Sequence, residues 1–589
     1  MITRSIHWRN CSLTVSDLIF EKFMPVVCMI FVIFMIIIFI MGIAERKSEK
    51  KKNTEKILKD FGRVIPGKGA PKPSCDLYMK FVNDKNIFVI DEITRNDIGF
   101  NELFKCVNRT YSSAGESVLL EKLLTSKLND NKKIKDFDEA VMAFEDEHLM
   151  TDTALKLMEL GKEKGKDPLL FFEMKELDKK GSIYYYLLFL IYLIGIALLF
   201  FNTGAGIILL TVNIAVSVVV YFKNKAGIYS YVRPAFYLLK LLKTGNELEN
   251  GPLADNKSSL ILGNIKGIDE CIRKSGNIFF GSGYISLSSE TSKSIFGAVA
   301  EYINMLFHID ILLFYGIYKK ITDRKDIFIR LYGYIGNIDT YISVLSYRKS
   351  IENWCVPDIS DDDMTIKSLY HPMIECPVKN DCSFEKGLLV TGSNASGKST
   401  FLKACALNIM FAQSIATVCG DSYTMPYLHL YTSMKVSDNL FTKDSFFLAE
   451  IKSIKRILDA VEEINESKEN TYRVACFIDE IFKGTNTIER VAASSQVIKS
   501  LSDKKVIFAT ASHDTELTYI LEDFVRNVHF EEKEDTDDVV FTYKLSQGPS
   551  TSRNAIRLLG RLGIESNITE KALKMTEEFS KTNKWSLAD

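Results

Sequence analysis

The sequence lacks the cysteine patterns that mark disulfide frameworks and zinc sites. Its 11 cysteines are scattered along 589 residues, from Cys11 to Cys476, without a C-x-x-C pair or a cluster of histidine and cysteine. We therefore expect free thiols in a reducing cytosol. The sequence also lacks an excess of charge of either sign, because 74 Lys and Arg stand against 75 Asp and Glu. No overall basic field indicates a nucleic-acid partner, although a local groove could still be basic.

What the sequence does have is long apolar runs. Residues 24–43 form an uncharged run that spans about one bilayer as a helix, and the residues after it, 45–52, are dense in positive charge. This asymmetry places the N-terminus outside the cell and the remainder inside. A cleaved signal peptide is the alternative, because Gly42 and Ala44 are small residues at the spacing of a cleavage site. The apolar core is longer than that of a usual signal peptide, which favours an uncleaved anchor.

Two further apolar runs, residues 183–201 and 205–222, are separated by only three residues, 202–204. Lysines stand at both outer ends and none in the turn, a pattern typical of a hairpin that enters and leaves the membrane on the cytoplasmic side. The alternative is a helical hairpin buried in a soluble core, but two uncharged runs of this length are hard to bury inside a domain. We predict three membrane spans and a multi-pass protein of the cell membrane. A fourth apolar stretch, 296–318, is interrupted by charged residues and is expected to be a core helix.

The most informative stretch is a phosphate-binding loop pattern, G-x-x-x-x-G-K-S, at residues 392–399. An apolar strand is expected before it, at 387–391, and a helix after it, at 400–407, which is the context that the motif requires. Backbone N–H groups of such a loop surround phosphate oxygens, while Lys398 would contact the β- and γ-phosphates and the Ser399 hydroxyl would hold Mg²⁺. The alternative is a glycine-rich turn that matches by accident. The residues predicted to bind ATP are Gly392, Ser393, Asn394, Ala395, Ser396, Gly397, Lys398, Ser399 and Thr400.

Two later strands end in residues suited to nucleotide hydrolysis. One apolar strand ends in Asp479 and Glu480, and we predict that Asp479 holds Mg²⁺ and that Glu480 deprotonates the attacking water. The next leads to His513, at a strand end where such a side chain can sense or polarise the γ-phosphate. A small polar loop at 484–487, which contains Asn486, could contact nucleotide or a partner subunit. The alternative for Asp479 and Glu480 is a strand that ends in acidic turn residues. For His513 it is a surface loop residue, and for the loop 484–487 it is a plain turn.

Three segments resemble, in order and spacing, the ATPase domain of the MutS DNA mismatch-repair family: residues 391–400, 479–487 and 508–513. The resemblance implies an ABC-like α/β P-loop ATPase of the MutS type that works with ATP and Mg²⁺ as a homodimer. It also implies that Ser445, at a helix start, and Asn486 complete the nucleotide site of the partner subunit.

The resemblance has clear limits. It covers residues 86–175 and 290–575 and is strong only in the second block. Nothing stands in for the family's mismatch-reading and connector domains, and the letters of its F-x-E signature at 171–173 fall in the core region by coincidence. Where the family inserts a DNA-gripping clamp between its lever helices, this chain carries the apolar hairpin 183–222, which we infer to replace the clamp.

We therefore expect an α/β ATPase domain and an all-α core and lever region with three transmembrane helices. The expected order is an N-terminal extracytoplasmic segment (1–23), a transmembrane helix (24–43), a basic linker (44–85), a helical core-like region (86–182), a transmembrane hairpin (183–222), a helical lever region (223–352), a cytoplasmic ATPase domain (353–545) and a C-terminal helical dimerisation segment (546–589).

The leading hypothesis is a membrane-anchored MutS-like ATPase. ATP binding would tighten a pair of copies and hydrolysis would release it, which would move the lever helices and the hairpin. DNA binding follows from the family alone, because the mismatch reader and the clamp are missing. A second hypothesis is an ABC-type half-transporter, but no L-S-G-G-Q lies between Lys398 and Asp479, and three spans do not form the usual pathway. A third is a non-catalytic, nucleotide-gated membrane scaffold, against which the complete set of motif residues argues.

Overall fold

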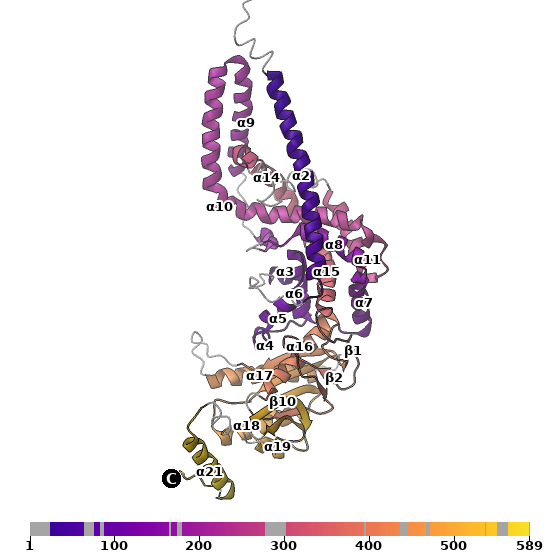
Figure 1. Ribbon diagram of the computed structural model, residues 1–589, viewed down its shortest axis with the longest axis vertical. Coiled ribbons are helices and arrows are strands. Elements are labelled where there is room, and N and C mark those ends of the chain that lie inside the picture. The colour runs from indigo at the N-terminus through magenta and orange to yellow at the C-terminus, as the bar shows by residue number, and fades with distance from the viewer. Residues whose placement is uncertain are drawn as a thin grey trace, which may run out of the picture. The chain divides into compact units, whose positions relative to one another are not determined.

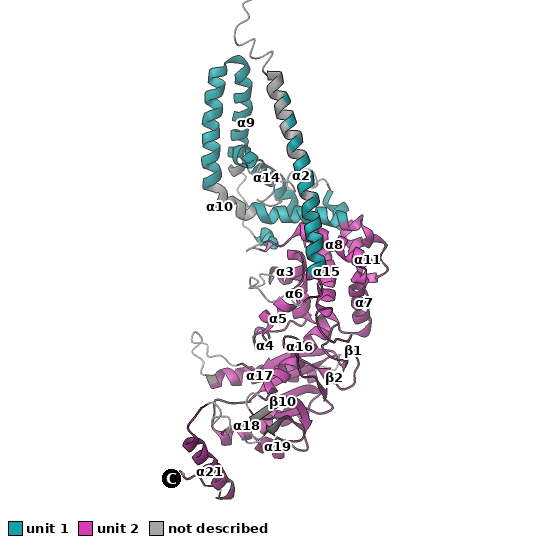
Figure 2. Cartoon of the chain, viewed as in Figure 1, with its two compact units in different colours: residues 1–59, 168–247, 270–328 teal, residues 60–167, 248–269, 329–589 magenta. Residues whose placement is uncertain are grey.

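The computed structural model describes residues 24–63, 76–82, 87–163, 167–173, 180–276, 302–393, 396–435, 446–466, 472–535, 538–550, 556, 563–582 and 584–587. The chain forms two compact units, each built from segments that are distant in the sequence (Figure 2). The first unit comprises residues 1–59, 168–247 and 270–328, and the second comprises residues 60–167, 248–269 and 329–589.

The second unit contains a six-stranded sheet with the strand order β10-β9-β4-β8-β7-β6. All neighbouring strands pair in parallel except β10 and β9, which are antiparallel. The strands are β4 (Leu388–Thr391), β6 (Leu428–Ser433), β7 (Arg473–Asp479), β8 (Val506–Ala511), β9 (Arg526–Asp535) and β10 (Asp538–Gln547). Strands β4, β7 and β8 are apolar and buried almost throughout, as expected for central parallel strands covered on both faces. Their carboxyl ends consequently meet at one edge of the sheet.

A smaller sheet lies in the same unit and has the order β1-β5-β2-β3. Its strands are β1 (Asp358–Ile359), β2 (Thr365–Leu369), β3 (Asn380–Ser383) and β5 (Ser422–Met425). Asn380 connects the two sheets, because its amide donates to Tyr543 O at 3.0 Å and accepts from Leu545 N at 2.8 Å. Strand β10 is thereby fixed beside β3.

Helices cover the six-stranded sheet. Helix α16 (Lys398–Ile415) is buried along almost its whole length, since it packs against the strands and against α6 (Ser113–Thr125). Helices α17 (Phe446–Glu466), α18 (Thr487–Ser502) and α19 (Glu516–Ile520) share one hydrophobic cluster with alternate residues of β7, namely Val474, Cys476 and Ile478. The sheet is therefore the middle layer of an α/β arrangement.

The remaining described helices of this unit belong mainly to the N-terminal half. They are α3 (Asp76–Val82), α4 (Glu92–Asp97), α5 (Phe100–Val107), α6, α7 (Asn131–Met142), η2 (Ala143–Glu145), α8 (Glu147–Leu160), η4 (Pro252–Asp255), parts of α11 (Ser259–Ser275) and α15 (Lys325–Arg348), and α21 (Ser566–Thr582) near the C-terminus. Helices α6 and α15 approach closely at Gly115, where a Cβ atom would lie 2.2 Å from Asp339 Oδ2. Asp339 is fully buried and accepts hydrogen bonds from Tyr111 N and Ser112 N, which fixes the start of α6.

The described elements of the first unit are all helices. Its elements are α2 (Met24–Asp60, to residue 59), η3 (Pro168–Glu173), α9 (Lys180–Phe201), α10 (Thr203–Glu249, to residue 247), α14 (Ile309–Thr322) and the adjoining parts of α11 and α15. Helices α9 and α10 form a hairpin (Figure 1), in which the Asn213 amide donates to Leu188 O at 3.1 Å. Helix α14 packs on α9 through Ile311 and Tyr185, and His308, fully buried with a φ of +52°, interrupts the fourth apolar stretch.

Two described helical segments are long and apolar enough to cross a membrane, Ile183–Phe201 and Thr203–Lys223. Only 22% and 28% of their residues are buried, whereas a core helix of a soluble protein is mostly buried. The expected run 24–43 lies in α2, but most of its side chains are outside the described residues, so this third span stays a prediction. In its coarser form, a helical N-terminal region followed by mixed α/β sheets, the predicted fold class is confirmed.

Candidate nucleotide site

The predicted phosphate loop connects the central strand β4 to helix α16. The loop begins at Gly392, with a φ of +139°, and ends at Gly397, with a φ of +112°. Both values lie where residues with a Cβ atom are strained, which explains why glycine stands at both ends. Asn394 and Ala395 lie outside the described residues. Ser396 is buried, whereas Thr400 is exposed on the first turn of α16.

The Lys398 ammonium faces the inside of the loop. Its Nζ donates to Gly392 O and Ser393 O, both at 2.8 Å, and lies 3.4 Å from His513 Nε2. The residue is 5% exposed. The structure thus places the positive charge at the centre of the loop, at the amino end of α16, where an anion is also favoured by the helix dipole.

Ser399 and Asp479 come together from two different elements. Ser399 lies in the first turn of α16, Asp479 ends β7, and the Ser399 hydroxyl donates to Asp479 Oδ2 at 2.5 Å. Among the described residues no group of three or more His, Cys, Asp or Glu side chains could hold a metal ion. One carboxylate and one hydroxyl fit Mg²⁺, which keeps several waters and shares phosphate oxygens, better than they fit a metal held entirely by side chains.

Glu480 is held by two cationic or proton-donating side chains. Its Oε1 lies 2.7 Å from His513 Nε2, and its Oε2 lies 2.6 Å from Lys483 Nζ. The hydrogen bond from His513, followed by that from Lys483, lowers the pKa of Glu480 to about 2. The backbone of Glu480 has a φ of +58°, and its N–H donates to Ala511 O at 2.9 Å. A turn in this conformation directs the carboxylate to the end of β8 rather than along its own strand.

Sequence reasoning missed the Lys483 contact and a second ion pair beside it. Arg490 of α18 donates to both carboxylate oxygens of Asp514, at 2.8 and 2.6 Å, and so fixes the residue that follows His513. In the sequence, Glu489 and Arg490 are only a departure from the MutS pattern after the polar loop. No sequence signal could have paired Arg490 with a residue 24 positions later.

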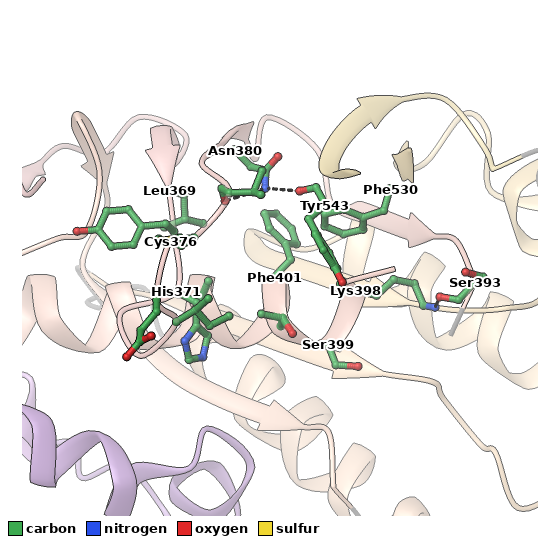
Figure 3. Close-up of a pocket in the computed structure, with 18 of the residues that line it drawn as sticks. Leu369, His371, Cys376, Asn380, Ser393, Lys398, Ser399, Phe401, Phe530 and Tyr543 are labelled. Carbon is green, nitrogen blue, oxygen red and sulfur yellow. Dashed lines mark hydrogen bonds between the residues drawn. The ribbon is translucent and has the colours of Figure 1, made fainter. Parts of the chain in front are cut away.

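A cavity of about 580 Å³ lies beside the loop (Figure 3). Lys398 and Ser399 line one part, and an aromatic wall of His371, Phe401, Phe530 and Tyr543 lines another, together with Tyr370 and the loop 374–378. Burial, with a smaller effect of Lys403, lowers the pKa of His371 to about 4, so its imidazole is neutral at pH 7. A polar, cationic end and an aromatic end suit a ligand that carries phosphates and a planar ring.

The predictions for Ser445 and Asn486 concern a partner's site and are not tested by this arrangement. Ser445 lies outside the described residues, immediately before α17. Asn486 is the N-cap of α18, where its side chain accepts a hydrogen bond from Glu489 N at 3.0 Å. Its described hydrogen bond is therefore that of a helix cap, and its contribution to a partner's site stays a prediction.

The class of this protein is defined by its mixed α/β domain. The domain carries a phosphate-loop sequence after its central strand, and two carboxylates and a histidine lie at the adjoining strand ends. Residues 388–580 match the family model of MutS domain V, and this match supports membership of the MutS family through this part of the chain. The chain is 28% identical over 283 residues to the DNA mismatch repair protein MutS of Thermotoga maritima, which covers 46% of this chain and 34% of the relative. It is 27% identical over 286 residues to that of Lactobacillus helveticus, covering 45% and 32%. It is 28% identical over 285 residues to the DNA mismatch repair protein MutS of Fusobacterium nucleatum, which covers 45% of this chain and 30% of the relative. The chain spans about a third of the length of these curated relatives.

Proposed function

We propose that the second unit binds ATP with Mg²⁺ and hydrolyses it. The observation that carries this proposal is the meeting of five side chains from three sequence segments, each of which a motif of its own predicts. Ser399 lies 2.5 Å from Asp479, Glu480 lies 2.7 Å from His513, and Lys398 lies 3.4 Å from the same histidine.

Each of these side chains has a distinct task in the proposed reaction. Lys398 and the loop N–H groups bind the β- and γ-phosphates, and Ser399 with Asp479 holds Mg²⁺, which neutralises phosphate charge when bound. Glu480 accepts the proton of the attacking water. His513, whose Nε2 lies 2.7 Å from Glu480 Oε1, keeps this carboxylate oriented and senses the γ-phosphate through its contact with Lys398. The aromatic residues of the cavity wall, Phe401 and Tyr543 among them, stack on the base.

Equilibrium binding of a fluorescent ATP analogue to the detergent-solubilised full chain tests the first half of the proposal. Lys398→Met should weaken binding by about 100-fold, because a charge-assisted contact to phosphate contributes ~2–3 kcal/mol. Lys386→Met is the matched control, since this exposed lysine on the same domain donates to Asp523 O. Equal binding by wild type and Lys398→Met would contradict the site.

We further propose that the hairpin of α9 and α10 inserts into a bilayer with the ATPase domain on the cytoplasmic side. The support is its length, its composition and its apolar outer surface, on which Phe201 and Ile208 are 89% and 66% exposed. Residues 24–43 would supply a third span. Two copies would pair through the ATPase domains, with Ser445 and Asn486 completing the partner's site, so that ATP turnover moves the helices connected to the membrane.

DNA binding is the part of the proposal that rests on the relatives, which are DNA mismatch repair proteins. The solubilised protein should be tested on paired, mismatched and branched duplexes, with and without ATP. Because phosphate contacts are strongest at low salt, retention of no duplex at low ionic strength would exclude a direct role on DNA.

A further inference from the structure

Helix α4 connects the helical part of the second unit to strand β6 and helix α17. Thr94 Oγ1 accepts a hydrogen bond from Thr432 N at 3.2 Å, and Asp91, the N-cap of α4, forms an ion pair with Arg456 of α17 at 2.5 Å. Arg456 also donates to Thr432 O. Thr432 lies near the end of β6. Its backbone N–H and its C=O are thus both held by residues that belong to α4 or contact it.

Asp97, at the end of α4, makes the largest set of these contacts. Its Oδ2 accepts from Thr432 Oγ1 at 2.7 Å and from Met434 N at 2.9 Å, and its Oδ1 accepts from Lys435 N at 2.8 Å. The residue is 1% exposed. Burial raises the pKa of Asp97 while these three donors lower it. A buried carboxylate is costly unless it is fully hydrogen-bonded, so its three donors must stay in place around it.

The backbone that Asp97 holds is next to the carboxylates of the nucleotide site. In the sheet, Ser433 of β6 pairs with Ile478 of β7, the residue before Asp479. Residues 433–435 line the same cavity, of about 420 Å³, as Asp479 and Glu480. Lys403 of α16 interacts electrostatically with both Asp97 and Asp479. A shift of residues 433–435 would therefore change the surroundings of both catalytic carboxylates.

We propose that Asp97 is a positioning residue for the nucleotide site. From the helical part of the unit it holds residues 433–435 beside Asp479 and Glu480, so that ATP turnover and the position of α4 depend on each other. Only Ile98 and Gly99 separate α4 from α5, whose Leu103 and Phe104 are buried, so a displacement of α4 is passed into the helical core. The inference rests on the proposed ATP hydrolysis, and the coupling is reciprocal because it is a free energy shared by two sites.

The test compares Asp97→Asn with Asp146→Asn in the detergent-solubilised full chain. Asp146 is the matched control, because it also accepts two backbone hydrogen bonds, from His148 N at 2.9 Å and Leu149 N at 3.2 Å, but at the exposed start of α8. Misplacement by ~1 Å can cost ~100-fold in rate, so Asp97→Asn should lower kcat by about 10-fold or more with the Kd for ATP within about two-fold of wild type. Asp146→Asn should change neither by more than about two-fold.

A second readout separates positioning from mere stability. ATP should alter the hydrogen exchange of α5 and α6 in wild type, and Asp97→Asn should bind ATP without this change. If Asp97→Asn does not fold, Thr432→Val removes one donor at constant volume and should lower kcat by about three-fold. Wild-type turnover by folded Asp97→Asn or Thr432→Val would overturn the inference. Absence of turnover in wild type would instead overturn the proposed function.

Discussion

Glu480 Oε1 lies 2.7 Å from Nε2 of His513, although the two residues are 33 positions apart in the sequence. The contact follows from the sheet, because β7 and β8 are parallel neighbours in which Asp479 pairs with Ala511. Each strand then turns, and its next polar side chains project from the same edge. A carboxylate and an imidazole at this distance form a proton-accepting pair whose orientation is set by the backbone.

Replacement of His513 by alanine should slow ATP hydrolysis without weakening ATP binding. Proton-transfer and orienting groups contribute about 100-fold or more to rate, so kcat should fall by about that factor while the Kd for ATP stays within about two-fold. His148→Ala is the control, since His148 is exposed on α8. A His513→Ala variant that turns over ATP at the wild-type rate would remove this residue from the site.

The hairpin should keep the protein in the membrane fraction after an alkaline carbonate wash. Leu193, half-exposed near the middle of the span in α9, is the position where an arginine costs most. Leu193→Arg should reduce the retained fraction, because a central arginine costs about 3 kcal/mol on insertion. Thr203→Arg, at the turn, should leave it unchanged. Release of the wild-type protein by carbonate would show that these helices do not span a bilayer.

Arg348 should be one of the most sensitive positions for stability in the second unit. Its guanidinium is fully buried, donates to Thr417 Oγ1 at 2.9 Å and Ala416 O at 2.7 Å, and pairs with Asp138 at 2.5 Å. Arg348→Met leaves these acceptors without their donor and should lower the unfolding free energy by about 3 kcal/mol or more. Lys132→Met, on the exposed side of α7, should change it little. Denaturant unfolding, monitored by intrinsic fluorescence, measures the unfolding free energy of both variants. Equal unfolding midpoints for Arg348→Met and wild type would contradict this role of Arg348.

Asp339 should make the stability of the second unit depend on pH. Burial raises its pKa to about 6 in the folded protein, above the ordinary value of 3.8, although hydrogen bonds from Ser112 and Tyr111 oppose the rise. The folded state therefore binds the proton more tightly, and this contribution to stability is present below about pH 4 and lost as pH rises through about 6. The stability advantage of wild type over Asp339→Asn should shrink across that interval. A stability advantage of wild type that grows as the pH rises would contradict the raised pKa of Asp339.

The sequence predicted the strands β4, β7 and β8 and the residues at their ends, because central parallel strands are short apolar runs with polar residues directly after them. It could not predict which strand ends meet. That depends on the strand order, in which β4 and β7 both flank β8, and the pairing of Glu480 with His513 follows only from this order. Lys483 and Arg490 were missed because a surface cation in a loop or on a helix gives no signal of its partner.

The helical part was harder to predict from the sequence. The patterns of residues 114–124 and 134–144 predict helices, and these segments overlap α6 and α7. The contacts of Asp97 and Asp339, however, join segments more than 200 residues apart and leave no local pattern. The hairpin was predicted because an uncharged run of membrane length is itself the signal. The break in the helix at His308 was not predicted, because no sequence pattern distinguishes a histidine with a left-handed backbone from one inside an apolar helix.

The most direct test of the central claim is a single-turnover measurement of ATP hydrolysis by the purified full chain, with and without Mg²⁺. Wild type should hydrolyse ATP only with Mg²⁺, and Glu480→Gln should bind ATP with a similar Kd but hydrolyse it about 100-fold or more slowly, because the amide cannot accept the water's proton. Turnover by Glu480→Gln at the wild-type rate, or hydrolysis by wild type that does not need Mg²⁺, would contradict the account.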